Sequence, residues 1–309
     1  MNILVTGGAG YIGSILVRRL LRLNFSVTII DDLRYGIFSI LDIINQKNIK
    51  LIKSDIRDIK VIDKLIRDND IVIHLAAIVG FPACSSDPIN AKTINDSATQ
   101  KISNLVKKYN KKIIFASSGS IYGKTKKIAD ENHKLSPLTL YGRTKRNGEK
   151  YVLNANGICL RFATLFGYSH RLRLDLLVND FCFQAYHNKQ IVLFEGEFKR
   201  TFLHVSDAVS SIIFSLNNYT KMKNNTFNIG SNNMNFTKKK LVERINRYID
   251  FKLIESEVGT DQDKRDYEVS YKKISALGFK QTKSIDYGIN ELLKIVPYIG
   301  RASYFNNSI

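Results

Sequence analysis

The stretch "VTGGAGYIGS" at residues 5–14 follows a short apolar run and opens an amphipathic pattern over 11–23. Gly7, Gly10 and Gly13 therefore stand between a predicted strand and a predicted helix, in GxxGxxG spacing. In such a turn one glycine makes the bend, another lets a diphosphate approach the backbone, and the last lets the helix pack closely on the strand. This context favours a dinucleotide site, which a lone glycine motif would not.

Apolar runs and amphipathic patterns alternate along the first half of the chain. Strands are predicted at 2–6, 26–31, 49–53, 70–76, 111–117 and 157–163, and helices near 11–23, 58–67, 90–109 and 141–155. Strict alternation implies right-handed crossovers and a parallel sheet that is covered on both faces. We therefore predict an α/β fold, a Rossmann-type doubly wound parallel sheet.

The pattern loosens after about residue 165 and predicts a smaller, mixed α/β C-terminal lobe. Its expected elements are helices near 172–187, 206–217, 237–249 and 285–295 and short strands near 191–194, 201–205 and 226–229. The predicted division is a dinucleotide-binding domain over 1–167 and about 201–218, a substrate lobe over 168–200 and 219–297, and a tail over 298–309.

The composition is that of a globular enzyme or binding protein. Of the 309 residues, 44% are hydrophobic and 24% are charged, and no apolar run approaches the roughly 20 residues of a membrane helix. The first residues also lack the pattern of a secretory leader. The three cysteines are scattered without metal-ligand spacing, which predicts reduced thiols, no metal site and a cytoplasmic protein.

The formal net charge of +19 could indicate an anionic partner, such as nucleic acid or a membrane surface. The lysines are dispersed, however, and the densest runs at 107–112 and 124–127 lack interleaved aromatic residues. We therefore expect a solvated basic surface, with neither nucleic acid nor a membrane as a partner.

Asp31 ends the second predicted strand, about 20 residues after the glycines, where an acidic group hydrogen-bonds the ribose hydroxyls of a dinucleotide. A 2'-phosphate about 4 Å from this carboxylate would be repelled by about 4 kcal/mol at an effective dielectric constant of about 20. The sequence therefore favours NAD over NADP, although Arg34 could soften the repulsion. Asp31 and Asp32 could otherwise simply form a turn after the strand.

The segment YGRTK at 141–145 places Tyr141 and Lys145 one helical turn apart, with their side chains on the same face. A tyrosine, whose ordinary pKa is about 10, acts as a base near neutral pH only if a cation lowers that pKa. Lys145 and an oxidised nicotinamide ring could do so together. Without the glycine motif, the same spacing would more often mean a surface tyrosine and lysine on an amphipathic helix.

A third segment, FASSGSIYG at 115–123, leaves the fifth predicted strand with Ser117 and Ser118 at its carboxyl end, where open parallel sheets bind ligands. Together the motifs resemble the extended short-chain dehydrogenase/reductase superfamily, in particular its NAD-dependent nucleotide-sugar epimerase/dehydratase branch. The residues that carry the resemblance, in this order and spacing, are 7–13, 31, 117–118, 141 and 145. The resemblance covers nearly the whole chain and implies a homodimer or a higher homo-oligomer.

The resemblance implies a role for each residue of the central group. Tyr141 would remove a proton from a sugar hydroxyl, and Lys145 would hold the nicotinamide ribose and tune Tyr141. Ser118 would hydrogen-bond the reacting oxygen, with Ser117 as the adjacent alternative. Asn95 would be structural or part of the proton path.

The same resemblance implies two sets of contacts. NAD contacts are expected from Gly7, Gly10, Tyr11, Ile12, Gly13, Asp31, Asp32, Asp55, Ile56, Leu75, Ala76, Ala77, Asn95, Ser117, Tyr141 and Lys145. Contacts to a nucleotide-diphosphate sugar, with a GDP-sugar favoured, are expected from Val79, Ser118, Gly119, Ser120, Arg173, Asn179, Arg200 and Arg265.

Arg200 opens the segment RTFLHVSD at 200–207, which resembles a motif whose arginine contacts the diphosphate of the sugar nucleotide. Its guanidinium suits a phosphate better than the point charge of a lysine does. The alternative for Arg200 is a surface salt bridge. His204 and Asp207 are expected to be core and capping residues.

Two departures from the family pattern narrow the reaction. The 4,6-dehydratases carry an Asp-Glu pair directly after the Ser/Thr, whereas Gly119 and Ser120 stand here, which disfavours elimination of water. Ala163 replaces the asparagine that the family carries after the sixth strand, so the usual sugar contact is not expected at this position.

Three further segments resemble bacterial GDP-D-glycero-D-manno-heptose 4-dehydrogenases, although they also occur in sugar epimerases. They are AAIVGFPAC at 76–84, RLRLDLLVNDF at 171–181 and DKRDYEVS at 263–270. They bring basic groups that could neutralise a diphosphate, namely Arg171, Arg173, Lys264 and Arg265.

We therefore expect NAD-dependent oxidation of a nucleotide sugar at C4, most like a GDP-heptose 4-dehydrogenase, for capsule or lipopolysaccharide synthesis. One alternative is a UDP- or GDP-sugar 4-epimerase, in which hydride returns to the opposite face of the sugar. A remote alternative is a non-catalytic, NAD-sensing or RNA-binding Rossmann protein.

Overall fold

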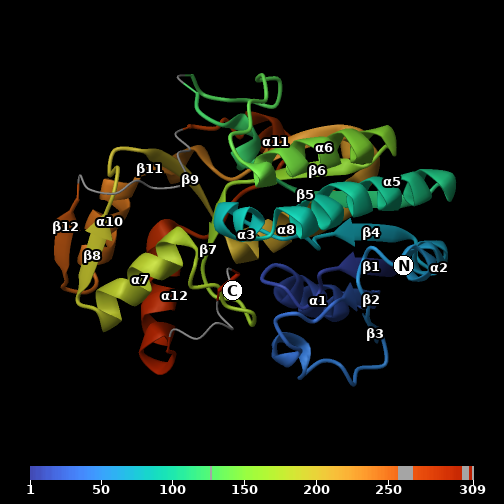
Figure 1. Ribbon diagram of the computed structural model, residues 1–309, viewed down its shortest axis with the longest axis horizontal. Helices are drawn as coiled ribbons and strands as arrows, with labels where there is room; N and C mark the ends of the chain where they lie inside the picture. The colour runs from blue at the N-terminus through green and yellow to red at the C-terminus, as the bar shows by residue number, and fades with distance from the viewer. Residues whose placement is uncertain (126, 257–266, 301–305, 308–309) are drawn as a thin grey trace.

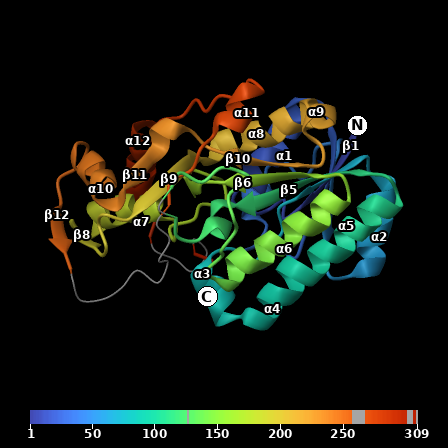
Figure 2. The same cartoon turned by 90° about the horizontal axis from the view of Figure 1, so that it is seen from above.

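A seven-stranded parallel sheet organises the computed structural model, which describes residues 1–125, 127–256, 267–300 and 306–307. The strand order is β10-β6-β5-β4-β1-β2-β3, which Figure 1 shows from β6 to β3 and Figure 2 shows at the β10 edge. The strands are β1 (Asn2–Thr6), β2 (Ser26–Asp31), β3 (Ile49–Lys53), β4 (Ile71–His74), β5 (Lys112–Ser118), β6 (Ile158–Phe162) and β10 (Asn225–Ile229). The predicted Rossmann-type doubly wound sheet is confirmed.

Helices cover both faces of the sheet, because amphipathic segments alternate with the strands (Figure 2). One face carries α1 (Gly13–Arg22) and α8 (Val205–Asn217), and the other carries α2 (Ile59–Asp68), α5 (Thr99–Lys108) and α6 (Leu140–Asn154). An apolar core lies on each side of the sheet. Leu16, Leu20 and Ile212 belong to the first core, and Ile62, Ile102 and Val152 belong to the second.

The helical connection between β4 and β5 contains a wide turn. This connection comprises α3 (Phe81–Ser86), α4 (Pro88–Lys92), a π-helical turn (Thr93–Ala98), which is the wide turn, and α5. The predicted helix over 90–109 is thus present but not regular. π-Helical turns hold one extra residue and frequently stand at functional sites. Asn95 lies in this turn and is buried.

A smaller mixed lobe follows β6 and has its own apolar core. Its strands are β7 (Thr164–Phe166), β8 (Gln190–Leu193), β9 (Lys199–His204), β11 (Asn235–Thr237) and β12 (Lys252–Glu255), which form the sheets β11-β9-β7 and β12-β8. Its helices are α7 (Leu177–His187), α10 (Lys238–Asn246) and α12 (Ile285–Ile295). The shorter helices of the chain are α9 (Tyr219–Met222) and α11 (Lys272–Ala276), with 3-10 turns at Phe38–Ile40, Gly119–Tyr122, Asn232–Met234 and Val296–Tyr298.

Several boundaries differ from the sequence prediction. β7 and the residues of β9 from 201 onward, which were expected in the dinucleotide-binding domain, pair with each other in the smaller sheet. The strand at 225–229, which the prediction placed in the substrate lobe, is β10 and pairs with β6 at the edge of the large sheet. The helix predicted over 172–187 begins only at Leu177. The reason is Asn179, whose buried amide donates to the carbonyl oxygens of Arg173 (2.8 Å) and Gly167 (3.3 Å) and so holds the preceding segment in a loop.

Three negative expectations concern membranes, metals and disulfides. Across the described part of the chain, no helix has the length and apolar character to cross a membrane. Within those same residues there is no cluster of histidine, cysteine and acidic side chains able to hold a metal ion. The thiols of Cys84, Cys159 and Cys182 are buried and form no disulfide.

Candidate active site

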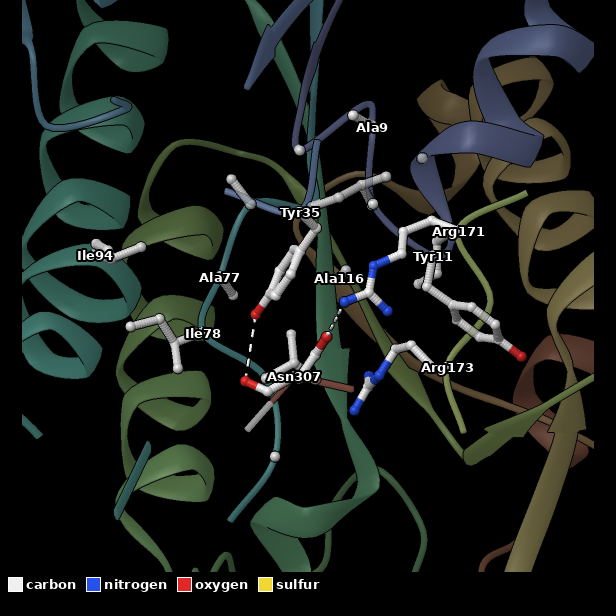
Figure 3. Close-up of a pocket in the computed structure, with 18 of the residues that line it drawn as sticks. Ala9, Tyr11, Tyr35, Ala77, Ile78, Ile94, Ala116, Arg171, Arg173 and Asn307 are labelled. Carbon is white, nitrogen blue, oxygen red and sulfur yellow. Dashed lines mark hydrogen bonds between the residues drawn. The ribbon is translucent and has the colours of Figure 1, made fainter. Parts of the chain in front are cut away.

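A pocket opens at the carboxyl ends of β1, β2, β4, β5 and β6, and segments from both lobes line it (Figure 3). This edge is where open parallel sheets bind their ligands. Every expected NAD contact except Asn95 lines it. Of the expected substrate contacts, Val79, Ser118 and Arg173 line it.

The glycine loop has the shape that a bound diphosphate requires. Gly7 has a φ of +73°, and a Cβ there would lie 2.8 Å from the backbone nitrogen of Ala76. A Cβ on Gly13 would lie 2.2 Å from the carbonyl oxygen of Gly7. A side chain at either position would therefore push β4 or α1 away from the loop. The close approach leaves the backbone amides at the start of α1 facing the pocket.

Asp31 is fixed at the end of β2 by the backbone of two loops. Its carboxylate accepts hydrogen bonds from the amides of Ala9 (3.0 Å) and Leu33 (2.9 Å). Burial raises the pKa of this carboxyl, and the two amides oppose that rise. The neighbouring Asp32 instead pairs with Arg34, at 2.7 Å. Arg34 is therefore already neutralised, and Asp31 remains the carboxylate suited to ribose hydroxyls.

Replacing Asp31 with asparagine is expected to narrow the preference for NAD over NADP by about a hundredfold, since a carboxylate close to a 2'-phosphate is repelled by several kcal/mol. Calorimetric dissociation constants for both dinucleotides measure the ratio. The matched control is Asp55→Asn, because Asp55 lies at the same end of the pocket but is held by Arg57 at 2.6 Å. If both variants shift the ratio equally, Asp31 is not the discriminating group.

Tyr141 and Lys145 enter the pocket from the first turns of α6. Thr139 caps this helix by accepting a hydrogen bond from the amide of Gly142 at 3.1 Å. Gly142 and Gly148 let α6 pack closely on its neighbours. A Cβ on Gly142 would lie 2.9 Å from the side chain of Pro137, and a Cβ on Gly148 would lie 2.7 Å from the Phe115 ring. The helix therefore packs directly on β5, which carries the two serines.

The Lys145 ammonium is buried and is held in place by β5. Its Nζ donates to the carbonyl oxygen of Ala116 at 2.6 Å and lies 4.6 Å from the centre of the Phe115 ring. The same nitrogen lies 5.8 Å from the centre of the Tyr141 ring. Burial lowers the pKa of Lys145 to about 8, while Cys84 and Glu149 act against that change.

Turnover is expected to fall as the pH rises through about 8, because Lys145 then loses its proton. Stability should not fall in this window. The folded state binds this proton less tightly than the unfolded chain does, because the pKa of Lys145 is about 8 in the folded state and 10.5 in the unfolded chain. Between pH 8 and pH 10.5 the contribution of Lys145 to the free energy of unfolding therefore rises with pH. Profiles of kcat and of Tm from pH 6 to about 10 separate the two effects. A Lys145→Arg variant keeps its positive charge at alkaline pH, so its kcat should not fall as the pH rises through about 8.

The two serines that end β5 have different surroundings. Ser117 donates its hydroxyl proton to the buried carboxylate of Glu149 at 2.6 Å. Ser118 instead accepts hydrogen bonds from the backbone amide and the hydroxyl of Ser120, at 3.2 and 2.9 Å. The proton of Ser118 thus remains available to a ligand oxygen, which favours Ser118 over Ser117 as the substrate-binding serine.

The Asn95 side chain does not line the pocket but holds the loop after β4 through hydrogen bonds to the backbone. Its side-chain oxygen accepts from the amide of Ile78 and its nitrogen donates to the carbonyl of Ile78, both at 2.8 Å. Both ends of the amide are therefore used by the backbone. This geometry favours the structural role over a place in the proton path.

Several expected substrate contacts lie away from the pocket. Arg200 is 2% exposed in β9 and donates to the carbonyl of Lys199 at 3.1 Å. Asn179 is the buried anchor of the loop before α7. Gly119 and Ser120 stand behind Ser118 in a 3-10 turn. Arg265, like Lys264, lies outside the described residues.

His204 and Asp207 cap and anchor helix α8, as expected. The His204 Nδ1 accepts from the amide of Ser206, and Asp207 accepts from Thr282 and from the amide of Lys283.

Sequence reasoning missed several residues of the pocket. Tyr35 and Leu165 line it, as does Asn307 near the end of the chain. Nothing in the local sequence distinguishes Tyr35 or Asn307, because their place depends on segments that meet only in the fold. Arg171, noted above only as a basic group, also lines the pocket.

Comparisons with known proteins agree with this geometry. A family model described as the NAD-dependent epimerase/dehydratase family matches residues 3–230. The chain is 33% identical over 245 residues to a putative UDP-glucose 4-epimerase of Methanocaldococcus jannaschii, across 74% of this chain and 76% of that protein. It is 30% identical over 260 residues to a UDP-glucose 4-epimerase of Lactobacillus helveticus, across 75% and 77% of the two chains.

A solved structure is similar over almost its whole length. It is the UDP-glucuronic acid 4-epimerase of Bacillus cereus in complex with UDP-glucuronic acid and NAD, with a TM-score of 0.83 and 26% identity, and the match covers 96% of this chain and 99% of that one.

Proposed function

Because the chain belongs to the NAD-dependent epimerase/dehydratase family, we propose that it is a 4-epimerase of UDP-sugars. One observation carries the proposal. Ser118, Tyr141 and Lys145 line the same pocket as the glycine loop and Asp31. The relatives reported above bear the names of UDP-sugar 4-epimerases, and they support this alternative better than the expected GDP-heptose 4-dehydrogenase. The expected homodimer and the place in surface-glycan synthesis remain predictions.

NAD is the cofactor of this family, and the Bacillus cereus neighbour is a complex with NAD. The residues of this chain fit it. The glycine loop leaves room that a Cβ would fill, and the Asp31 carboxylate stands at the end of β2. When bound, NAD supplies the acceptor and donor of hydride.

The protein groups handle the proton and the sugar oxygen. Tyr141 would take the proton of the C4 hydroxyl and later return it, and Ser118 would donate a hydrogen bond to the same oxygen. The Lys145 ammonium near the Tyr141 ring favours the ionised phenol. The same residues serve both half-reactions, since Tyr141 takes the proton during oxidation and returns it during reduction.

A 4-epimerase must also let the oxidised sugar present its opposite face. Ala163 directly follows Phe162, which pairs with Ser118 across β5 and β6. Ala163 lines the pocket. The sugar must turn between the two half-reactions, and at this position the pocket wall is a methyl group that makes no hydrogen bond to it.

The test is to incubate the purified protein with NAD and, separately, UDP-glucose or UDP-glucuronic acid, and to resolve the C4 epimers by chromatography. We expect interconversion without net reduction of NAD. A substrate deuterated at C4 should give a product that keeps the deuterium. Reduction of NAD in proportion to product, with a GDP-heptose in a parallel incubation, would instead identify a 4-dehydrogenase and overturn the proposal. No turnover of any sugar nucleotide would favour the non-catalytic alternative.

A further inference from the structure

Four of the described residues that line the pocket carry a positive charge. Arg34 pairs with Asp32 at 2.7 Å, and Arg173 pairs with Asp175 at 2.5 Å. Lys145 is held at the Ala116 carbonyl. The fourth is Arg171, whose Nη1 donates to the carbonyl oxygen of Leu172 at 2.9 Å.

The segment that carries Arg171 is attached to the glycine loop through Ser169. Ser169 donates to the carbonyl of Tyr11 at 2.6 Å, and its hydroxyl oxygen accepts from the amide of Arg171 at 3.3 Å. The Arg171 guanidinium lies 4.2 Å from the centre of the Tyr35 ring, and the residue is only 1% exposed. A guanidinium whose plane is fixed by an aromatic ring loses little freedom when it binds an anion.

Two residues near the end of the chain contact this guanidinium. Its Nη2 donates to the backbone oxygen of Asn306 at 3.1 Å. The same nitrogen donates to the side-chain oxygen of Asn307, also at 3.1 Å (Figure 3). The Tyr35 hydroxyl donates to the backbone oxygen of Asn307 at 3.4 Å. Asn307 lines the same pocket as Gly10, Gly13 and Asp31.

The oxygens of Asn306 and Asn307 accept from the guanidinium as phosphate oxygens would, and neither of these two oxygens carries a negative charge. A guanidinium binds anionic oxygens more strongly than neutral ones and fits a phosphate with two parallel hydrogen bonds. The backbone amides at the start of α1 offer the same kind of ligand a second set of donors. A diphosphate between the glycine loop and Arg171 would therefore have donors on two sides.

We propose that Arg171 binds the diphosphate of the dinucleotide, and that Asn306 and Asn307 occupy this guanidinium in the ligand-free protein and compete with NAD. The proposal rests on the proposed function only for the identity of the dinucleotide. Only those molecules whose Arg171 is not occupied by the asparagines can bind NAD, so the apparent affinity for NAD equals the intrinsic affinity multiplied by the fraction of such molecules. Asn306 and Asn307 are neutral, so the diphosphate displaces their oxygens at a moderate cost in affinity.

Three full-length variants test the competition through calorimetric dissociation constants for NAD and for ADP-ribose. Asn307→Ala removes one competing oxygen and should tighten binding by about twofold to fivefold. Asn307→Asp supplies an anionic competitor and should weaken binding by about fivefold or more. Asn306→Ala keeps its backbone oxygen and should leave the dissociation constant unchanged.

Arg171→Gln should weaken both ligands by about tenfold to a hundredfold, since a hydrogen bond to a charged group is lost. In this background the two Asn307 substitutions should have no effect. Melting temperatures of all variants show whether the fold is kept. If Arg171→Gln does not fold, the opposite directions of the two Asn307 variants still decide the question.

The proposal is overturned if Asn307→Ala weakens binding, because Asn307 would then be part of the bound site, or if Asn307→Asp leaves it unchanged. Binding of ADP-ribose needs neither turnover nor a sugar, so a failure here is distinct from a failure of the proposed epimerase. An inactive protein that still shows the expected shifts would refute the proposed function alone.

Discussion

Replacing Tyr141 with phenylalanine is expected to lower kcat by a factor of about 100 to 10,000, which is the usual contribution of a general acid or base. The substitution removes only the phenolic oxygen. The aromatic ring 5.8 Å from the Lys145 ammonium stays, and so does the glycine loop. Binding of NAD should therefore change little, and the loss should appear in turnover.

The measurement is the rate of C4 epimerisation under saturating sugar nucleotide, with the dissociation constant for NAD determined on the same preparations. Tyr151→Phe is the matched control, because Tyr151 stands on the same helix and donates to Asp96 at 2.9 Å, away from the pocket. Unchanged turnover in Tyr141→Phe would end the catalytic assignment. Loss of NAD binding would mean that Tyr141 holds the cofactor instead of moving a proton.

Replacing Arg161 with leucine is expected to destabilise the fold by about 3 to 5 kcal/mol, because it leaves the Glu149 carboxylate buried without its partner. Arg161 Nη2 lies 2.7 Å from Glu149 Oε2, and the side chains are 5% and 4% exposed. Arg161 also donates to the Tyr122 hydroxyl at 2.8 Å. A change of this size corresponds to a fall in Tm of about 10 °C.

Thermal and urea unfolding of the variant measure this loss. The exposed pair of Arg67 and Asp63 provides the control, since Arg67→Leu should cost less than about 1 kcal/mol. A double variant with Glu149→Leu and Arg161→Leu should recover part of the stability, because the orphaned charge is gone. If the double variant is as unstable as the sum of the two single ones, the ion pair is not the cause.

The ion pair of Arg161 and Glu149 also contacts a serine that lines the active site. Glu149 follows Lys145 by one helical turn on α6 and accepts the hydroxyl proton of Ser117. The pair thus fixes the end of β5 against α6, where Ser118 and Tyr141 must meet. Variants that keep the fold but lose this contact should lose turnover as well as stability.

Sequence alone predicted the features that depend on residues close together in the chain. The glycines at 7, 10 and 13 require only a strand before them and a helix after them, and Tyr141 with Lys145 requires only one turn of helix. The parallel direction of the strands followed from the alternation of apolar runs and amphipathic helices. These local patterns were enough for six of the seven strands of the central sheet and for the group around Tyr141, whereas β10 was expected in the other lobe.

The remaining features depend on contacts between distant segments. Arg171 and Tyr35 are far apart in the chain, yet their side chains stack in the pocket. Arg200 carries the residue type of a phosphate ligand, but burial in β9 keeps it from the pocket surface. A motif gives the residue type, whereas the direction of a side chain follows from which segment packs on it.

The π-helical turn at Thr93–Ala98 limits how the chain can tolerate insertions and deletions. Each residue of a helix turns the chain by about 100°, so the extra residue in this turn sets the rotational phase of everything in α5. Ile102 and Val106 point into the core under this phase. Loss of a single residue upstream would rotate them toward solvent and pull the Asn95 amide away from Ile78. Natural length variation in this region should therefore be confined to the loops on either side.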